Sequence, residues 1–386
     1  MKVRIYFPYA PFPTTEGAYL VVADQLRYFA KRGDEVEFVC WRETEETLKE
    51  KRNLSGMGGD ARWTLLKCRK ESRWTRISRI VQSLPTTSSS VEAFHFPANL
   101  LSQVSDLEPV DLAIYHFSFA YVWLARRGLL PKEELRVVHF HNIESELHAL
   151  RRGGFGLIQW INVRKLRAHE RRLPGLIDEA WFLSPLDALK LKMNRMRLVP
   201  PTFDPTLRRK RKAGCARTII LGFIGALDNR PNFESVKWLL EKLSPVLLAG
   251  GFSGKLLIAG RDPPRRLREL GRKFEFVEFA GFVKNIDEFW SRLSFLAAPH
   301  IVGSGVRTKI LEAIASGVPV LTNPGGAAPL SEGVRASPFL ICEDDAAGWA
   351  ERILGERAPF GLRKALEGEP TPDDLIAESV YASIVK

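Results

Sequence analysis

The chain alternates short apolar segments with segments of helical periodicity, and it does so in two successive series. The first series opens with an apolar run at 2–8, and apolar residues then recur at helical spacing from Tyr19 to Arg32. Strands that alternate with helices predict a parallel sheet with helices on both faces. A chain of 386 residues is also long enough to form two such α/β domains.

A segment without apolar periodicity separates the two series. Prolines at 200, 201 and 205 precede the basic run Arg208–Lys212, which is a composition typical of a linker. We therefore predict an N-terminal domain at 1–204, a linker at 205–217 and a second domain at 218–372. The last residues, 373–386, are predicted to form a helix that can return to the N-terminal domain.

Composition restricts the class of protein. Hydrophobic residues make up 45% of the chain and charged residues 26%, as in soluble globular proteins, and no apolar run is long enough to cross a bilayer. The four cysteines lie far apart and form neither a metal-ligand spacing nor a disulfide framework, which favours the cytoplasm. The net charge of +12 points to an anionic partner, which is a phosphate-bearing ligand, an acidic membrane or nucleic acid.

The stretch from Ala298 to Gly326 carries the most chemical information. An apolar strand runs into Gly303, Ser304 and Gly305, and a helix follows at once. Glycines let the backbone approach a ligand closely, and a helix N-terminus offers unpaired N–H groups and a positive dipole end to a phosphate. The loop therefore predicts a phosphate site.

Charged residues follow this loop at the start of the helix. Arg307 and Lys309 are expected in the first turn, where cations are unfavourable for the helix itself and make better sense beside a diphosphate. Glu312 lies farther along the predicted helix, where we expect it to be within reach of a ribose hydroxyl pair.

The same stretch resembles the family 4 retaining glycosyltransferases of the GT-B fold, also called glycosyl transferases group 1. The segments Leu311–Ala313 and Gly317–Val320 match the family's Leu-Glu-Ala and Gly-x-Pro-Val motifs. The resemblance implies two Rossmann-like, doubly wound domains facing across a cleft, with the donor held mainly by the second. Glu312 matches the second glutamate of the E-x7-E motif, whereas Ser304 stands where the first is expected.

The resemblance assigns roles to further loops of the chain. The loop carrying Gly225 and Arg230 is similar to the family's opening of the second domain, where cations contact the donor diphosphate. Gly281 and Val283 match a turn whose backbone meets the nucleobase. In the first domain, Gly17 corresponds to a loop that approaches the donor phosphate or the acceptor.

Three histidines lie at the ends of predicted strands in the first domain. These are His116, His139 and His141, and the segment His141–Glu144 resembles the H-N-x-E of one branch of the family. A strand-end histidine that faces the cleft can orient donor hydroxyls or the acceptor, and His141 is the first candidate. The alternative is that the histidines are core residues with satisfied hydrogen bonds.

The resemblance implies that a sugar moves from a nucleoside diphosphate to a hydroxyl acceptor with retention of configuration. Arg307, Lys309 and Arg230 would stabilise the departing diphosphate, so we expect neither a metal nor a cofactor. Two alternatives remain, namely a GT-B epimerase of nucleotide sugars and a non-catalytic nucleotide-binding protein. Nucleic acid is not an expected partner, because no RNA-binding signature accompanies the basic run.

The segment 151–172 is rich in arginine and lysine, and apolar residues, among them Trp160, are interleaved with them. A basic helix with an aromatic residue on its apolar side can lie on an anionic membrane. We therefore expect a cytoplasmic enzyme with an option of peripheral attachment to the inner face of the membrane. The alternative is a helix that packs on the sheet and exposes a solvated face.

Overall fold

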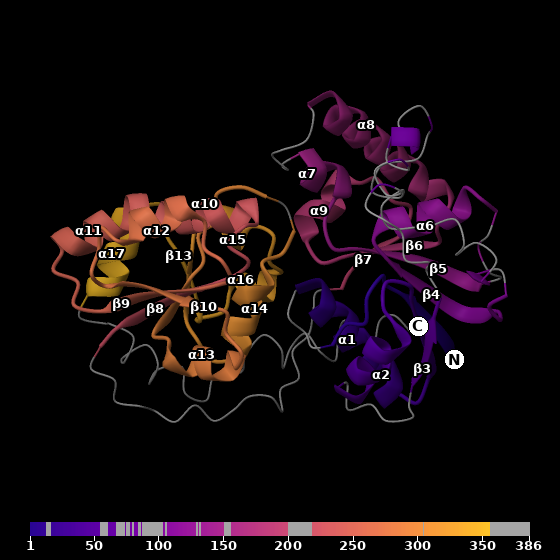
Figure 1. Ribbon diagram of the computed structural model, residues 1–386, viewed down its shortest axis with the longest axis horizontal. Coiled ribbons are helices and arrows are strands. Elements are labelled where there is room, and N and C mark those ends of the chain that lie inside the picture. Colours follow the sequence, from indigo (N-terminus) through magenta and orange to yellow (C-terminus); the bar gives the residue numbers. More distant parts are fainter. Residues whose placement is uncertain are drawn as a thin grey trace. The chain divides into compact units, whose positions relative to one another are not determined.

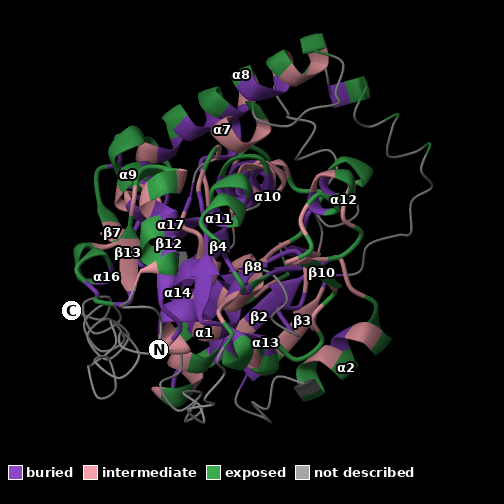
Figure 2. Ribbon diagram, turned by 90° about the vertical axis from the view of Figure 1, so that its left-hand side faces the viewer, coloured by how far each residue is buried: buried purple, intermediate pink, exposed green. Residues whose placement is uncertain are grey.

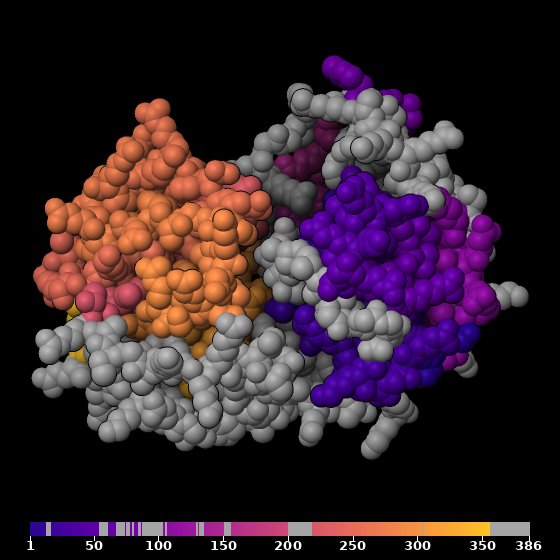
Figure 3. Space-filling model, turned by 60° about the horizontal axis from the view of Figure 1, so that its bottom comes forward, coloured from indigo at the N-terminus to yellow at the C-terminus, as the bar shows by residue number. Residues whose placement is uncertain are grey.

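The structure is a computed structural model that divides into two compact units, Met1–Pro201 and Thr202–Lys386. It describes residues 1–12, 17–54, 61–66, 74, 78, 81–83, 86, 103–104, 106–128, 130, 133–149, 156–199, 218–303 and 305–355. Grey marks the other residues in Figures 1 and 3. The predicted linker at 205–217, the predicted helix at 373–386 and Ser304 lie outside the described residues.

The N-terminal unit is built on a seven-stranded parallel sheet with the order β3-β2-β1-β4-β5-β6-β7. Its elements follow the chain as β1 (Lys2–Tyr6), α1 (Gly17–Lys31), β2 (Glu35–Cys40), α2 (Glu45–Leu54), β3 (Ala61–Leu65), β4 (Val110–His116), α6 (Ser118–Ala125), β5 (Glu133–Phe140), α7 (Glu144–Ala149), α8 (Gly156–Arg172), η2 (Leu173–Gly175), β6 (Glu179–Phe182), α9 (Pro185–Lys190) and β7 (Met196–Leu198).

The C-terminal unit is built on a six-stranded parallel sheet with the order β10-β9-β8-β11-β12-β13. Its elements are β8 (Ile220–Ile224), α10 (Arg230–Trp238), the π-helical turn η4 (Leu239–Leu243), α11 (Ser244–Ala249), β9 (Lys255–Ala259), α12 (Arg265–Gly271), β10 (Val277–Gly281), α13 (Ile286–Arg292), β11 (Phe295–Ala297), α14 (Thr308–Ala315), β12 (Val320–Thr322), α15 (Pro324–Ala327), α16 (Glu332–Arg335), β13 (Leu340–Cys342) and α17 (Ala346–Leu354).

Helices cover both faces of the second sheet, as Figure 1 shows. One buried cluster joins the sheet to α10, α11, α12 and α17, and another joins its opposite face to α13 and α14. The inner strands β8, β9, β11 and β12 are mostly buried, whereas the edge strands β10 and β13 are partly exposed. The outer faces of the helices are exposed (Figure 2). The prediction of two α/β domains with parallel sheets is confirmed.

The strand order reverses once in each sheet. In the first sheet β1 lies between β2 and β4, and in the second β8 lies between β9 and β11. Ligands of open α/β sheets bind outside the carboxyl ends of the strands at such a switch point. The loops that follow β8 and β11 are therefore the first places to look for a site in the C-terminal unit.

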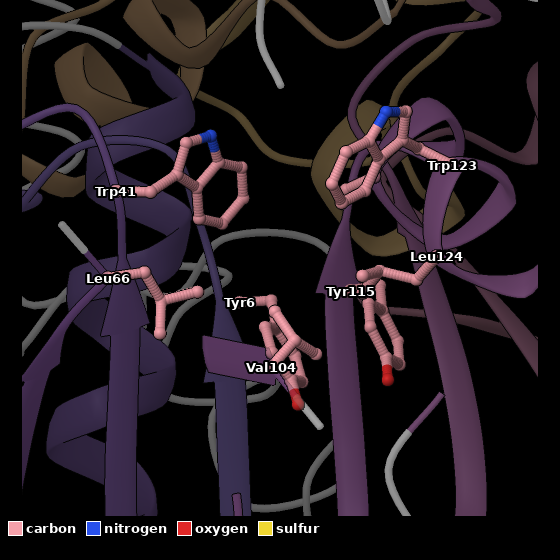
Figure 4. Close-up of a pocket in the computed structure, with 8 residues that line it drawn as sticks. Tyr6, Trp41, Leu66, Val104, Tyr115, Trp123 and Leu124 are labelled. Carbon is pink, nitrogen blue, oxygen red and sulfur yellow. The ribbon is translucent and has the colours of Figure 1, made fainter. Parts of the chain in front are cut away.

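Successive residues at the end of β4 point to opposite faces of the first sheet. Tyr115 belongs to a cluster with Tyr6 and the residues of α6, and Figure 4 shows these aromatic side chains around a small pocket with Trp41 and Trp123. Because the pocket walls are aromatic and aliphatic, they suit core packing and not the binding of a polar sugar. His116 is directed to the other face, where α1 packs.

Two predicted positions need correction. Arg307 is not in the first turn of α14 but is its N-cap residue, with an extended backbone (φ −85°, ψ 91°), so the helix starts at Thr308. His141 does not end a strand, because β5 stops at Phe140. Both residues lie in loops, where the backbone no longer restricts the side chain to one face of an element.

Candidate donor site and histidine cluster

An asparagine at the start of α10 links the loop after β8 to α14. Asn232 donates from Nδ2 to the carbonyl oxygen of Ala226 at 3.0 Å and accepts at Oδ1 from Lys309 Nζ at 2.8 Å. A Cβ on Gly225 would lie 2.7 Å from Asn232 Nδ2, so any larger residue there would displace the asparagine side chain. The asparagine thereby fixes the lysine of α14 against the first loop.

Lys309 is also held by an aromatic ring. Its Nζ lies 4.0 Å from the centroid of the Phe223 ring, which is a cation–π distance. An ammonium carries three donors, and the carbonyl of Asn232 takes one of them. The lysine is thus oriented by protein groups and retains donors for an anionic ligand.

Arg307 reaches back to the end of β11. Its Nε and a terminal guanidinium nitrogen both donate to His300 Nδ1, at 3.1 and 2.7 Å, and the same terminal nitrogen donates to the carbonyl oxygen of Val302 at 3.1 Å. A Cβ on Gly303, whose φ is +122°, would lie 2.4 Å from that guanidinium. Glycine therefore provides the space in which the arginine folds over the loop.

His300 is anchored by its backbone to Asn323, which follows β12. Asn323 Oδ1 accepts from the His300 N–H and Asn323 Nδ2 donates to the His300 carbonyl, both at 2.9 Å. Burial and the neighbouring Arg307 lower the pKa of His300 to about 4. The ring is therefore neutral at physiological pH, which allows its Nδ1 to accept from the guanidinium.

Two opposite charges share one face of α14, because positions three apart are neighbours on a helix. Burial, and to a smaller extent the positive charge of Arg307, lowers the pKa of Lys309 to about 7, while the charge of Glu312 opposes this shift. Burial raises the pKa of Glu312 to about 7, against the attraction of Lys309. A phosphate next to Lys309 would favour the ammonium, because an opposite charge stabilises the charged form.

The remaining residues predicted for the donor site surround the same sheet edge. Arg230 is the first residue of α10, and Gly281 is the last residue of β10, with a φ of +69°. Val283 is half-buried against the cluster under α13 and α14, and Gly305 is buried with a φ of +77°. The roles that the resemblance implies for these residues stay predictions, as does any role for Ser304.

The three histidines of the first domain do come together. His116 Nδ1 lies 2.7 Å from His141 Nε2, and the ring of His139 lies 5.2 Å from that of His116. Gln25, from the buried face of α1, joins them: its Oε1 lies 3.0 Å from His116 Nε2 and its Nε2 lies 2.7 Å from His139 Nδ1. All four side chains are buried.

The residue after β4 adopts an unusual backbone conformation beside this cluster. Phe117 has a φ of +75°, which is strained for a residue with a Cβ, and its ring centroid lies 4.8 Å from that of His141. Phe7 packs on both rings, at 5.5 Å from Phe117 and 6.3 Å from His141. Strained backbone is frequent at ligand sites, so this loop is a candidate part of one. Gly17 is the first residue of α1, and residues 13–16 before it are not described.

Sequence reasoning missed four residues that organise these sites, namely Gln25, Asn232, His300 and Asn323. His300 and Asn323 lie within the informative stretch, but nothing in the sequence shows that they bond to each other. Gln25 was detectable, because it is a polar residue on the buried face of α1. Such a residue needs partners inside the protein.

The outer face of α8 is exposed and basic. Leu157 and Trp160 are 70% and 55% exposed, and the guanidinium of Arg164 lies 4.7 Å from the Trp160 ring centroid. Arg167 and Arg171 continue this face toward the end of the helix. Glu170, the acidic residue of the segment 151–172, does not belong to this exposed face, because it is buried and accepts a hydrogen bond from the backbone N–H of Ser145. The start of the basic segment, 151–155, lies outside the described residues.

Within the described ranges, no helix is both long and apolar enough to span a bilayer. Over the same ranges, no group of three or more His, Cys, Asp or Glu side chains is arranged to hold a metal ion.

Comparison with known families finds a match for the second domain. Residues 218–355 match the family Glycosyl transferases group 1, which confirms the resemblance to that group, while family 4 and the retaining subtype stay predictions. No curated protein sequence matches the chain significantly.

Solved structures resemble the chain over its whole length. HepE of Anabaena in complex with UDP-glucose is 14% identical, with a TM-score of 0.64 over 100% of this chain and 99% of that one. TarM is 10% identical, with a TM-score of 0.67 over 98% and 97% of the two chains. A glycosyltransferase of Rickettsia africae is 11% identical, with a TM-score of 0.58 over 100% and 98%. At these identities the likeness establishes the fold.

Proposed function

Because residues 218–355 match the family model of the glycosyl transferases group 1, we propose that the chain transfers a sugar from a nucleoside diphosphate to a hydroxyl acceptor. We further propose retention of configuration and no requirement for a metal ion. The main support is the pair of cations Arg307 and Lys309 at the start of α14, each held by a side-chain partner of the same domain.

These two cations suit a diphosphate better than they suit the helix. Cations near a helix N-terminus are unfavourable, and a phosphate there reverses the interaction. Because His300 and Asn232 fix their orientation, little reorganisation is needed when charge develops on the leaving group. Glu312, three residues after Lys309, is proposed to accept hydrogen bonds from the ribose.

The rest of the donor site follows the same sheet edge. Arg230 is proposed to add a third cation toward the diphosphate, and Gly303, Ser304 and Gly305 to admit the phosphates to the backbone. The backbone at Gly281 and Val283 is proposed to meet the nucleobase. In the first domain, Gly17 and His141 are proposed to contact the transferred sugar or the acceptor.

The test is a panel of nucleoside diphosphate sugars in thermal unfolding. A donor at a hundred times its Kd should add about 2.7 kcal/mol to the free energy of unfolding. UDP-glucose is the first to try, because it was bound to HepE. Stabilisation by the free nucleotide but by no sugar donor would favour a nucleotide-binding protein, and no stabilisation by either would contradict the proposal.

An epimerase is the alternative within the same fold, and no feature of the described residues favours it. It would change the sugar of the donor in the absence of any acceptor, which incubation followed by sugar analysis detects. A transferase instead releases nucleoside diphosphate in proportion to the glycosylated acceptor.

We propose in addition that the acceptor is lipid-linked and that the enzyme meets it at the cytoplasmic surface of a membrane. The exposed face of α8 supports this, because Leu157 and Trp160 precede Arg164, Arg167 and Arg171 on one side of the helix. A tryptophan at headgroup level and arginines toward anionic lipids are what such a surface requires.

A further inference from the structure

The histidine cluster contains a hydrogen-bonded chain of four side chains. It runs from His139 through Gln25 and His116 to His141, with donor–acceptor distances of 2.7, 3.0 and 2.7 Å. Within the described residues, no hydrogen bond involves Nδ1 of His141, which is the last nitrogen of the chain. His141 lies in the loop that follows β5, at the carboxyl edge of the sheet.

We propose that Gln25 is a positioning residue that locks His141 in one tautomer, with a bare Nδ1 that accepts a hydrogen bond from a substrate hydroxyl. The hydroxyl belongs to the donor sugar or to the acceptor, so this part of the inference rests on the proposed function. A buried side chain of α1 thereby sets the direction of the hydrogen bonds that reach His141.

The chemistry of the amide sets that direction. An amide oxygen only accepts, so the Gln25 Oε1 contact requires a proton on His116 Nε2. A neutral imidazole carries one N–H, so His116 Nδ1 is bare and accepts from His141 Nε2. The same rule then leaves His141 Nδ1 without a proton. At the other end, the Gln25 amide NH₂ donates to a bare His139 Nδ1.

The surroundings keep all three rings neutral, and only a neutral ring can accept a hydrogen bond, because an imidazolium has no bare nitrogen. Burial is the main cause in each ring: it lowers the pKa of His141 to about 3, and it holds the pKa values of His116 and His139 well below the ordinary range. The other two rings lower the pKa of His116 further, and His141 lowers that of His139 further. At physiological pH the rings are therefore not protonated, and the direction of the hydrogen bonds between them is preserved.

Histidine nitrogen NMR of the ¹⁵N-labelled full chain, without any donor, tests the lock directly, because protonated and bare imidazole nitrogens have well separated shifts. We expect a proton on Nε2 of each ring and a bare Nδ1 on His141, whose signals are assigned by their loss in His141→Gln. A proton on His141 Nδ1 would overturn the proposal, because the chain would then run in the opposite direction.

Two substitutions at one position separate the lock from packing. Gln25→Leu removes the acceptor and replaces it with an apolar side chain of similar size. This variant should leave His141 as a mixture of tautomers. Gln25→Glu keeps an oxygen that accepts from His116 in either protonation state, and His141 should keep its bare Nδ1. An unchanged His141 tautomer in Gln25→Leu would contradict the role of Gln25. If Gln25→Leu does not fold, the wild-type and Gln25→Glu spectra decide.

The kinetic readout uses the transferase reaction. Gln25→Leu should lower kcat/KM on the order of tenfold, as the loss of one oriented hydrogen bond does, and Gln25→Glu should restore most of it. Equal losses in both variants, with the tautomer changed only in the first, would overturn the link to substrate. If the spectra show the expected tautomers but the wild type turns over no donor, the proposed function fails while the tautomer assignment stands.

Discussion

His300 accepts two hydrogen bonds at one ring nitrogen from the guanidinium of Arg307, at 3.1 and 2.7 Å. The histidine is itself fixed at its backbone by Asn323, so β12 indirectly positions a cation at the start of α14. A charge whose position is set before the ligand arrives stabilises a transition state without reorganisation.

Removing this acceptor should impair the reaction without removing the cation. In His300→Ala, Arg307 loses a charge-assisted interaction of about 1.5–3 kcal/mol, so kcat should fall by up to roughly 10- to 150-fold while the protein stays folded. His300→Asn, which keeps an acceptor on a shorter side chain, is the matched control and should lose less. Steady-state kinetics of both variants check this, and a fully active His300→Ala would show that Arg307 does not depend on it.

Arg307→Ala and Lys309→Ala should reduce turnover more than donor binding. The negative charge of the leaving diphosphate is larger in the transition state than in the bound donor, so the cations matter most there. Comparing the donor Kd from calorimetry with kcat gives the two losses separately. Equal losses in donor affinity and in kcat would indicate that the cations only anchor the bound donor. Lys242→Ala, which removes an exposed cation of the same domain, is the control.

Glu312→Ala should weaken donor binding without unfolding the chain. The loss of hydrogen bonds from the ribose to a carboxylate is worth about 1.5–3 kcal/mol, which is roughly a 10- to 150-fold increase in Kd. Calorimetric titration with nucleotide measures it, with circular dichroism to verify the fold. An unchanged Kd in a folded variant excludes the proposed contact.

The raised pKa of Glu312, about 7, also predicts a pH dependence of stability. Between its ordinary pKa and 7 the folded state binds more protons at this site than the unfolded state, so its contribution to stability falls as pH rises. Glu312→Gln removes that slope, and the stability of the wild type relative to this variant should therefore decrease from pH 5 to pH 7.5. Urea unfolding at both values checks the sign, and an increase would contradict it.

Transfer should survive EDTA, since Arg307, Lys309 and Arg230 are proposed to carry the diphosphate charge in place of a metal. The measurement is the initial rate before and after chelation, with magnesium or manganese added back. A rate that disappears with EDTA and returns with either ion would refute metal independence.

The exposed face of α8 should bind anionic vesicles and not neutral ones. Each Lys or Arg near such a surface contributes about 1 kcal/mol, and the attraction fades within a Debye length of about 8 Å at physiological salt. Charge reversal of Arg164, Arg167 and Arg171 should therefore abolish co-sedimentation, which rising salt weakens. Trp160→Ala should lower the part that salt does not remove, and no binding at low salt would leave α8 as a solvated face.

The sequence by itself determined the fold class and one helix of the donor site. Apolar periodicity depends on which residues are buried along one element, so alternating strands and helices predicted both parallel sheets. Positions Lys309 and Glu312 share a helix face by spacing alone, and Gly303 and Gly305 indicated a turn that only glycine adopts easily. Local geometry carries all of these, which is why local patterns sufficed.

Only the tertiary structure decided which side chains meet. Gln25 contacts histidines 91 and 114 residues away, and Lys309 contacts an asparagine 77 residues away. No spacing rule links such positions, because they come together only when β1, β4 and β5, or β8 and β11, are ordered in their sheets. The pKa values of Lys309 and Glu312 followed from the same step, since burial and neighbouring charges exist only once the elements have packed.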